Sequence, residues 1–305
     1  MREKIELYQL RSFSDKLSAV FAFFGENWKV LLKYLVYFLL PLSLVQPIAM
    51  DGYFSGAMAL DQLEDEASEG IVKLIGSMGA MIVLYTIGSL LMMVIVYALM
   101  RVYRRRENRL LQLSWDELRP DFWMLVRRCL FIMVFSIAIT IFIGLVMLYF
   151  AYIIHPAAAL VVMLLIIPVC IPLALLYPIY FFEDDITLFQ AIGKAFHLGF
   201  PTWGGIFGIL IVLSFLGSFV SGAISLPWTI LTVVKTVLGD DADEYSFINS
   251  VGFSFVHYLL GIVQAFVGYF AYSLPFIGLA YQYGHACEKV DHVTIDNDIN
   301  RFEQL

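Results

Sequence analysis

Charged residues are scarce in this chain: only 15% of its 305 residues are Asp, Glu, Lys or Arg, whereas 61% are apolar. A soluble globular domain of this composition would have too little polar surface to cover its core. The apolar residues occur in runs of about 20 or more, the length that an α-helix needs to cross roughly 30 Å of hydrocarbon. The sequence therefore predicts an all-α, polytopic membrane protein.

Cysteine is scarce too, and no catalytic or cofactor-binding motif stands out. Cys129, Cys170 and Cys287 form an odd set, so we expect reduced thiols packed as small apolar residues rather than a disulfide. Residues 1–28 carry charges throughout and lack an apolar segment with a small-residue cleavage site, so no removable signal peptide is expected. We predict a protein that is not an enzyme and takes no cofactor.

The apolar runs and the charges between them predict a topology. Only Lys73 and Lys235 fall in the two acidic loops, 51–73 and 235–247, so 17 of the 19 Lys and Arg residues lie in segments on the other side. Cytoplasmic segments of membrane proteins carry this excess, so we expect both termini in the cytoplasm and a multi-pass protein of a bacterial inner membrane. Six membrane helices are predicted, at about 30–50, 74–100, 123–153, 157–182, 203–234 and 248–283.

The segment 101–128, RVYRRRENRLLQLSWDELRPDFWMLVRR, holds eight of the 19 basic residues. One interpretation is that it only fixes the topology; the other is that it binds anionic lipid head groups, since each basic residue near such a surface contributes about 1 kcal/mol. Membrane lipids and a membrane-protein partner are therefore the expected partners, and nucleic acid is not. The candidate lipid-binding residues are Arg101, Arg104, Arg105, Arg106, Arg109, Arg127 and Arg128.

The cytoplasmic entries share a pattern: an amphipathic helix, a Gly or Pro break, a Trp and then a span. It occurs at 13–28, 110–123 and 186–203, and in the first copy we expect the interfacial helix to end at Gly25. The chain would then be a single membrane domain of three two-helix units, each headed by an interfacial amphipathic helix. Boundary Trp residues are general in membrane proteins, so the pattern also has a plainer explanation. The predicted units are 13–109, 110–185 and 186–283, followed by a polar cytoplasmic tail, 284–305.

The stretch 181–213, FFEDDITLFQAIGKAFHLGFPTWGGIFGILIVL, resembles a known domain. It is similar to the six-helix membrane domain that accompanies some bacterial glycerophosphodiester phosphodiesterases, and to that domain's uncharacterised stand-alone relatives. The shared features are an acidic residue after an apolar span, an amphipathic helix, a break, a Trp and a Gly-rich span. The resemblance implies the six-span architecture. It transfers no activity, because nothing in the sequence resembles the phosphodiesterase domain.

Polar groups inside the spans are few. His257 and Gln264 are seven residues apart on the sixth span and so share a face. They would either line a substrate path or simply make an interhelical hydrogen bond and a near-surface contact. The tail holds five residues capable of binding a metal, but their spacing matches no strong signature, so no metal site is predicted. These five are His285, Cys287, Glu288, Asp291 and His292.

The leading functional hypothesis is a non-enzymatic accessory or scaffold protein whose cytoplasmic amphipathic helices contact lipid. A small-molecule or lipid transporter is the alternative, although buried charges and paired interrupted helices, which mark many transport sites, are lacking. A lipid-active membrane enzyme is a further alternative.

Overall fold

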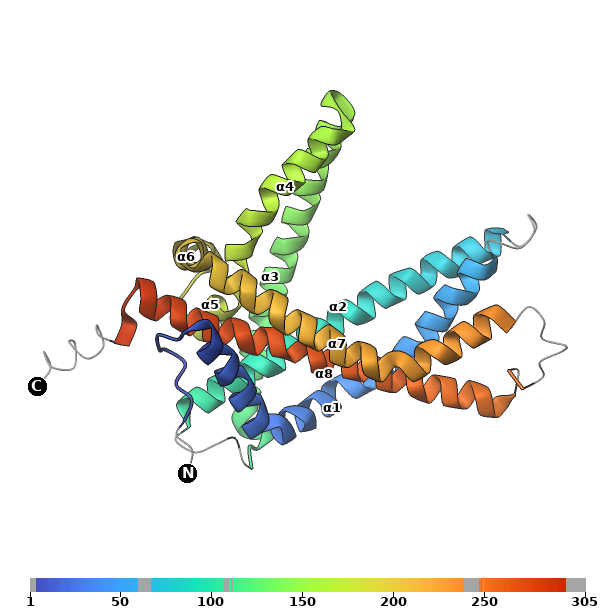
Figure 1. Cartoon of the computed structure of the whole chain (residues 1–305), viewed down its shortest axis with the longest axis horizontal. Helices are drawn as coiled ribbons and strands as arrows, with labels where there is room; N and C mark the ends of the chain where they lie inside the picture. The colour runs from blue at the N-terminus through green and yellow to red at the C-terminus, as the bar shows by residue number, and fades with distance from the viewer. Residues whose placement is uncertain are drawn as a thin grey trace, which may run out of the picture. The chain divides into compact units, whose positions relative to one another are not determined.

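The structure is a computed structural model that describes residues 4–59, 67–106, 110, 112–238, 247–248 and 250–294. All its regular elements within these residues are helices, as the sequence predicts (Figure 1). Six of them are long and apolar enough to cross a membrane. This confirms an all-α protein and indicates a multi-pass membrane protein.

Five of the predicted spans correspond to longer helices, whereas the predicted span 157–182 is divided by a turn into α4 and α5. The elements are α1 (Phe13–Ala59), α2 (Ala67–Arg105), α3 (Trp115–Tyr149), a π-helical turn (Phe150–Ile154), α4 (Pro156–Leu173), α5 (Leu176–Phe182), α6 (Leu188–Gly199), a 3-10 turn (Phe200–Thr202), α7 (Trp203–Leu238) and α8 (Val251–Val290).

Several predicted boundaries differ from those observed. The first helix does not end at Gly25 but runs unbroken through it, because a helix tolerates an interior glycine at a cost of only about 1 kcal/mol. The predicted loop 51–73 is shorter, since α1 reaches Ala59 and α2 begins at Ala67, and the residues between them lie outside those described. Likewise α8 continues to Val290, so the first residues of the predicted tail are helical.

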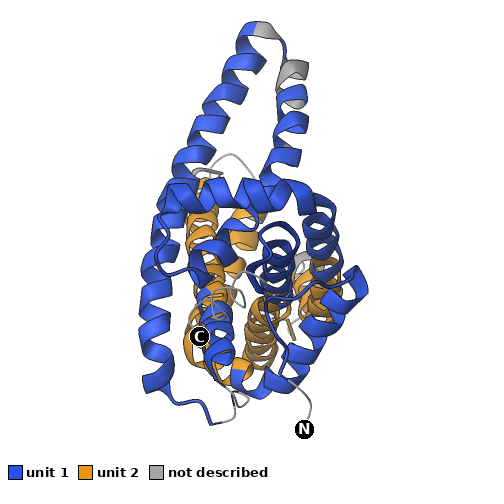
Figure 2. Ribbon diagram, turned by 90° about the vertical axis from the view of Figure 1, so that its left-hand side faces the viewer, with its two compact units in different colours: residues 1–30, 94–213, 274–305 blue, residues 31–93, 214–273 orange. Residues whose placement is uncertain are grey.

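The residues group into two compact units (Figure 2). Unit 1 comprises 1–30, 94–213 and 274–305, and unit 2 comprises 31–93 and 214–273. Helices α1, α2, α7 and α8 each contribute segments to both. This grouping by contacts differs from the three two-helix units of the sequence pattern, which stay a prediction.

An aromatic cluster forms part of the core of unit 1. The Tyr97 ring packs edge-on against Phe181, Phe182 and Phe276, with ring centroids 5.3, 5.7 and 6.3 Å away. Such pairs contribute about 0.5–1.5 kcal/mol each beyond the burial of their area. They tie the last turn of α5, the segment that enters the 183–187 loop, to α2 and α8.

Helix α6 of unit 1 begins at Leu188, two residues later than the predicted start at residue 186, and Thr187 is its N-cap. The Thr187 side chain accepts from the backbone N–H of Gln190, and the Gln190 side chain accepts from the Thr187 N–H, which makes a capping box. The helix buries Ala191, Ala195 and Leu198 and ends at a 3-10 turn before α7 begins at Trp203, as the predicted break requires. Its apolar side opposite this buried face carries Phe189, which is 76% exposed.

In the same unit, α3 and α4 form a hairpin (Figure 1). The chain reverses at His155, whose backbone is extended, and Pro156 then starts α4. A proline suits a helix start because its missing N–H would have no helical partner there.

Unit 2 is held by close helix contacts and a buried polar group. Gly217 faces the carbonyl of Ala271 so closely that a Cβ on Gly217 would lie 3.1 Å from that oxygen. The Gln46 side chain is fully buried and donates to the Tyr269 hydroxyl at 2.9 Å, and that hydroxyl donates to the carbonyl of Leu84 at 3.3 Å. Small residues and interhelical hydrogen bonds are the means by which membrane helices pack closely.

Candidate functional site

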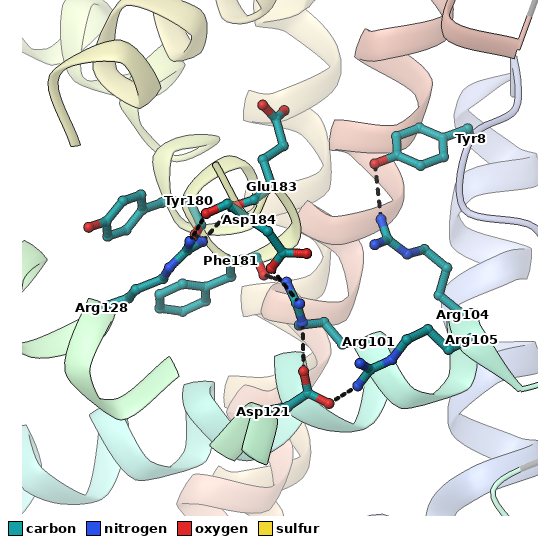
Figure 3. Close-up of polar contacts among 10 residues, drawn as sticks. All are labelled: Tyr8, Arg101, Arg104, Arg105, Asp121, Arg128, Tyr180, Phe181, Glu183 and Asp184. Atoms are coloured by element: carbon teal, nitrogen blue, oxygen red, sulfur yellow. Dashed lines mark hydrogen bonds and ion pairs between the residues drawn. The ribbon is translucent and has the colours of Figure 1, made fainter. Parts of the chain in front are cut away.

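Arg101 lies at the centre of the basic segment's ion pairs, all within unit 1. Its Nε is 3.0 Å from Oδ1 of Asp121 on α3, and one terminal nitrogen is 2.7 Å from Oδ1 of Asp184, in the loop after α5 (Figure 3). The other terminal nitrogen donates to the carbonyl of Phe181 at 2.6 Å. A buried guanidinium needs this many acceptors, because each unmet donor would retain its desolvation cost. Arg101 therefore joins the end of α2 to α3 and α5.

Two neighbours on the same helix extend this set. Arg105 pairs with the second carboxylate oxygen of Asp121. Arg104 donates to the Tyr8 hydroxyl at 3.2 Å (Figure 3). Its guanidinium lies over the Phe182 ring, 5.6 Å from the centroid. Burial raises the pKa of the Tyr8 phenol, so this hydroxyl stays protonated and accepts from Arg104.

Arg128, on α3, holds the end of α5. It donates to the carbonyls of Tyr180, Glu183 and Asp184, and lies over the Tyr180 ring at 4.9 Å from the centroid (Figure 3). The last carbonyls of a helix lack helical partners and carry a partial negative charge, which a guanidinium satisfies.

The acidic loop after α5 is thus fixed by arginines on two helices. Burial acts to raise the pKa of the Asp184 carboxyl, but the hydrogen bond and charge of Arg101, with the charge of Arg128, outweigh it and hold that pKa below its ordinary value. Glu183 accepts from the Tyr283 hydroxyl at 2.6 Å and pairs with Lys194 at 2.8 Å. The set forms a structural network that binds five helices of unit 1 together.

The predicted lipid-binding arginines therefore divide into groups. Arg101, Arg104, Arg105 and Arg128 make the contacts above, and Arg106 pairs with Glu117. Arg109 lies outside the described residues. Arg127 is exposed, and it is the one described candidate arginine that has no ion-pair or hydrogen-bond partner in the described part of the chain.

A second free arginine lies on the same helix, and the sequence analysis missed it. Arg119 is exposed and, like Arg127, makes no polar contact to the residues described. Trp123, 58% exposed, lies between them, and the spacing of four puts all three on one side of α3. This spacing was the signal available in the sequence. We call Arg119, Trp123 and Arg127 the α3 basic face; it leads into exposed apolar side chains, among them Leu130, Phe131, Val134 and Ile137.

The intramembrane candidates His257 and Gln264 have separate surroundings in unit 2. His257 is 3% exposed; its Nε2 lies 2.9 Å from Oγ1 of Thr232, and its ring stacks on Trp228 with centroids 5.7 Å apart. The side-chain oxygen of Gln264 is buried and has no partner among the residues described. No contact joins the two candidates.

Two of the metal-capable tail residues, His285 and Glu288, accept hydrogen bonds from backbone N–H groups of unit 1. His285 accepts the backbone N–H of Arg11 on Nδ1 at 3.1 Å, and Glu288 accepts from the backbone N–H of Thr294 at 3.0 Å. Cys287 is buried. Over the described ranges, no three His, Cys, Asp or Glu side chains come together in a way that would hold a metal ion.

Comparison with known proteins adds no relative: no family model, curated protein or solved structure matches this chain.

Proposed function

We propose that this chain is a non-enzymatic accessory or scaffold protein of a bacterial inner membrane, which contacts anionic lipid head groups through the α3 basic face. The observation that carries the proposal is the pair of exposed guanidinium groups of Arg119 and Arg127, on either side of an exposed Trp123, neither of which has a polar partner among the residues described. Arginine binds phosphate through paired N–H donors, and Trp favours the level of the head groups. The apolar residues that follow on α3 suit the acyl chains of the same lipid.

The distribution of charge supports the orientation in this proposal. Apart from Lys73 and Lys235, the basic residues lie in segments that the positive-inside rule assigns to the cytoplasm, the side of the anionic leaflet surface. The exposed apolar side of α6, with Phe189, is suited to lie in the interface of that leaflet. The six-helix architecture implied by the sequence resemblance is part of the same proposal.

A structural role for the other arginines favours a scaffold over an enzyme. The network around Arg101 uses its carboxylates and guanidinium groups to join helices, so they are not available as an acid, a base or an anion site. Ion pairs of this kind fix geometry rather than supply chemistry. A rigid cytoplasmic end with two free arginines suits a protein that organises lipid.

The test is the lipid that the protein retains in nanodiscs made from equal parts of a zwitterionic and an anionic phospholipid, measured by mass spectrometry. We expect Arg119→Gln with Arg127→Gln to weaken retention of the anionic lipid by roughly tenfold or more, since each arginine contributes about 1 kcal/mol. Arg119→Lys with Arg127→Lys should keep part of it. Lys73→Gln, an equally exposed cation at the far end of α2, is the matched control and should leave retention unchanged. Equal retention by the Gln double variant and the native chain would refute the proposal.

One observation favours the alternative of a transporter. His257 is buried in a span and lies near a carboxylate, and buried ionisable groups in spans mark ion paths in many membrane proteins.

A further inference from the structure

His257 lies in a group of side chains from three helices of unit 2 that the lipid contact does not use. Its Nδ1 faces the carboxylate of Asp51, on α1, at 3.8 Å. Lys235, on α7, lies 3.3 Å from the same carboxylate oxygen. The side chains of Asp51 and Lys235 are 43% and 42% exposed, whereas that of His257 is 4% exposed. The imidazole is thus buried, with one edge toward two charged groups that reach solvent or head groups.

The hydrogen bonds of the other ring nitrogen fix the position of one proton. The Thr232 hydroxyl donates to the carbonyl of Trp228, one turn earlier, at 2.9 Å. Its single hydrogen is then used, so it accepts from Nε2–H of His257 at 2.9 Å. In the neutral tautomer that follows, Nδ1 has a bare lone pair that faces a carboxylate. Two acceptors facing each other at this distance favour a proton on Nδ1.

The aromatic surroundings favour the charged imidazole as well. The His257 ring stacks with Trp228 and Phe253, with centroids 5.7 and 6.3 Å away and interplanar angles of 21° and 5°. The negative faces of aromatic rings attract a cation. Burial and the Lys235 ammonium act in the opposite direction, so proton uptake by the ring depends on both of its charged neighbours.

We propose that His257 and Asp51 form a proton-binding site: a proton taken up on Nδ1 of His257 pairs with the Asp51 carboxylate, and Lys235 opposes this uptake. Among the residues that the structure describes, the charged groups that face the imidazole are Asp51 on α1 and Lys235 on α7. Its own helix adds none, since the neighbouring Tyr258 donates its hydroxyl to the carbonyl of Leu44. Proton uptake would create an ion pair between α1 and α8 and weaken the ion pair of Lys235 with Asp51.

Trp228 provides a direct readout, because an imidazolium stacked on an indole quenches its fluorescence. The experiment records fluorescence against pH for the full chain in detergent, and again for Trp228→Phe, and takes the difference as the signal of Trp228. The buried Nε1 of Trp228 has no partner in the described residues, so the Phe variant loses no hydrogen bond. We expect the signal of Trp228 to fall on acidification, as the imidazole takes up its proton.

Three variants distinguish the site from general acid sensitivity. His257→Gln should abolish the transition. Asp51→Asn should move the midpoint to lower pH by about 1 unit, the lower end of the effect of an opposite charge at this distance. Lys235→Gln should move it to higher pH. The last two side chains are exposed enough to leave folding intact, so their opposite shifts test the proposal even if His257→Gln does not fold. A native signal flat from about pH 4 to 9, or midpoints indifferent to both charges, would overturn it.

Discussion

Arg101 and Asp121 form an ion pair in which both side chains are almost fully buried: Nε lies 3.0 Å from Oδ1, and the side chains are 6% and 4% exposed. Removing one partner of a buried pair leaves an uncompensated charge in a poor solvent, which costs more than the pair contributes as a whole. The pair therefore holds the end of α2 against α3 chiefly because separating the two helices would leave a buried charge without its partner.

We expect Asp121→Ala to destabilise the protein by about 3 kcal/mol, the lower end of the range for removing one partner of a buried pair, because Asp184 still partners Arg101. The measurement is thermal unfolding in detergent, followed by circular dichroism. Glu117→Ala is the matched control: its pair with Arg106 is more exposed, so the change should cost about 1 kcal/mol or less. Equal losses in the two variants would mean that the buried pair has no special role.

These partners also show where sequence reasoning ends. The apolar runs predicted six spans because membrane crossing depends on local length and composition, and the structure has six such helices. The capping box of α6 could be predicted because Thr187 and Gln190 are three residues apart. The two carboxylates that accept from Arg101, in contrast, lie 20 and 83 residues away in the sequence, and no local pattern identifies them. The arginine cluster was therefore open to interpretation as a lipid site.

Arg119 and Arg127 also show that a sequence does not reveal which arginines have polar partners. A sequence can show that Arg119, Trp123 and Arg127 share a helix face, but not that both arginines lack a partner while Arg128, next in the chain, has several. His257 was found because a histidine within an apolar span is conspicuous. Its neighbours Asp51 and Thr232 come from other helices, so the group itself could only be seen in three dimensions.

The contact of Gly88 with Tyr269 in unit 2 predicts a strongly position-dependent effect of alanine on α2. A Cβ on Gly88 would overlap the Tyr269 ring, whose hydroxyl is held by Gln46. We expect Gly88→Ala to lower stability by about 1–3 kcal/mol, as overpacking does. Thermal unfolding in detergent is again the measurement.

The control for that change lies on the same helix. Nothing lies within 4 Å of a Cβ built on Gly79, so Gly79→Ala should be neutral or stabilise the helix by up to about 1 kcal/mol. If neither alanine lowered the melting temperature, the close approach of Tyr269 to Gly88 on α2 would be refuted.

The cap of α6 gives a local prediction. Thr187→Ala removes the hydroxyl that accepts from the Gln190 N–H, and caps of this kind contribute about 1 kcal/mol. We expect faster hydrogen exchange in the first turn of α6, with little change elsewhere. Thr187→Ser keeps the acceptor and should exchange as the native chain does. Equal exchange in the Ala and Ser variants would show that the cap does not hold this helix start.

The loop carboxylate Asp184 predicts how stability depends on pH. Its pKa in the folded protein is below the ordinary value, because the hydrogen bond and charge of Arg101 outweigh the effect of burial. As the pH falls, the unfolded chain takes up this proton first. The stabilisation is therefore complete above the ordinary aspartate pKa of about 4 and is lost as the pH falls through the lower pKa of the folded state. The side chain is 59% exposed, so the contribution is small.

Asp184→Asn should therefore melt slightly below the native chain at neutral pH, and the two melting temperatures should converge below about pH 4. A constant difference between them from neutral to acid pH would show that the Asp184 charge does not contribute to stability through Arg101.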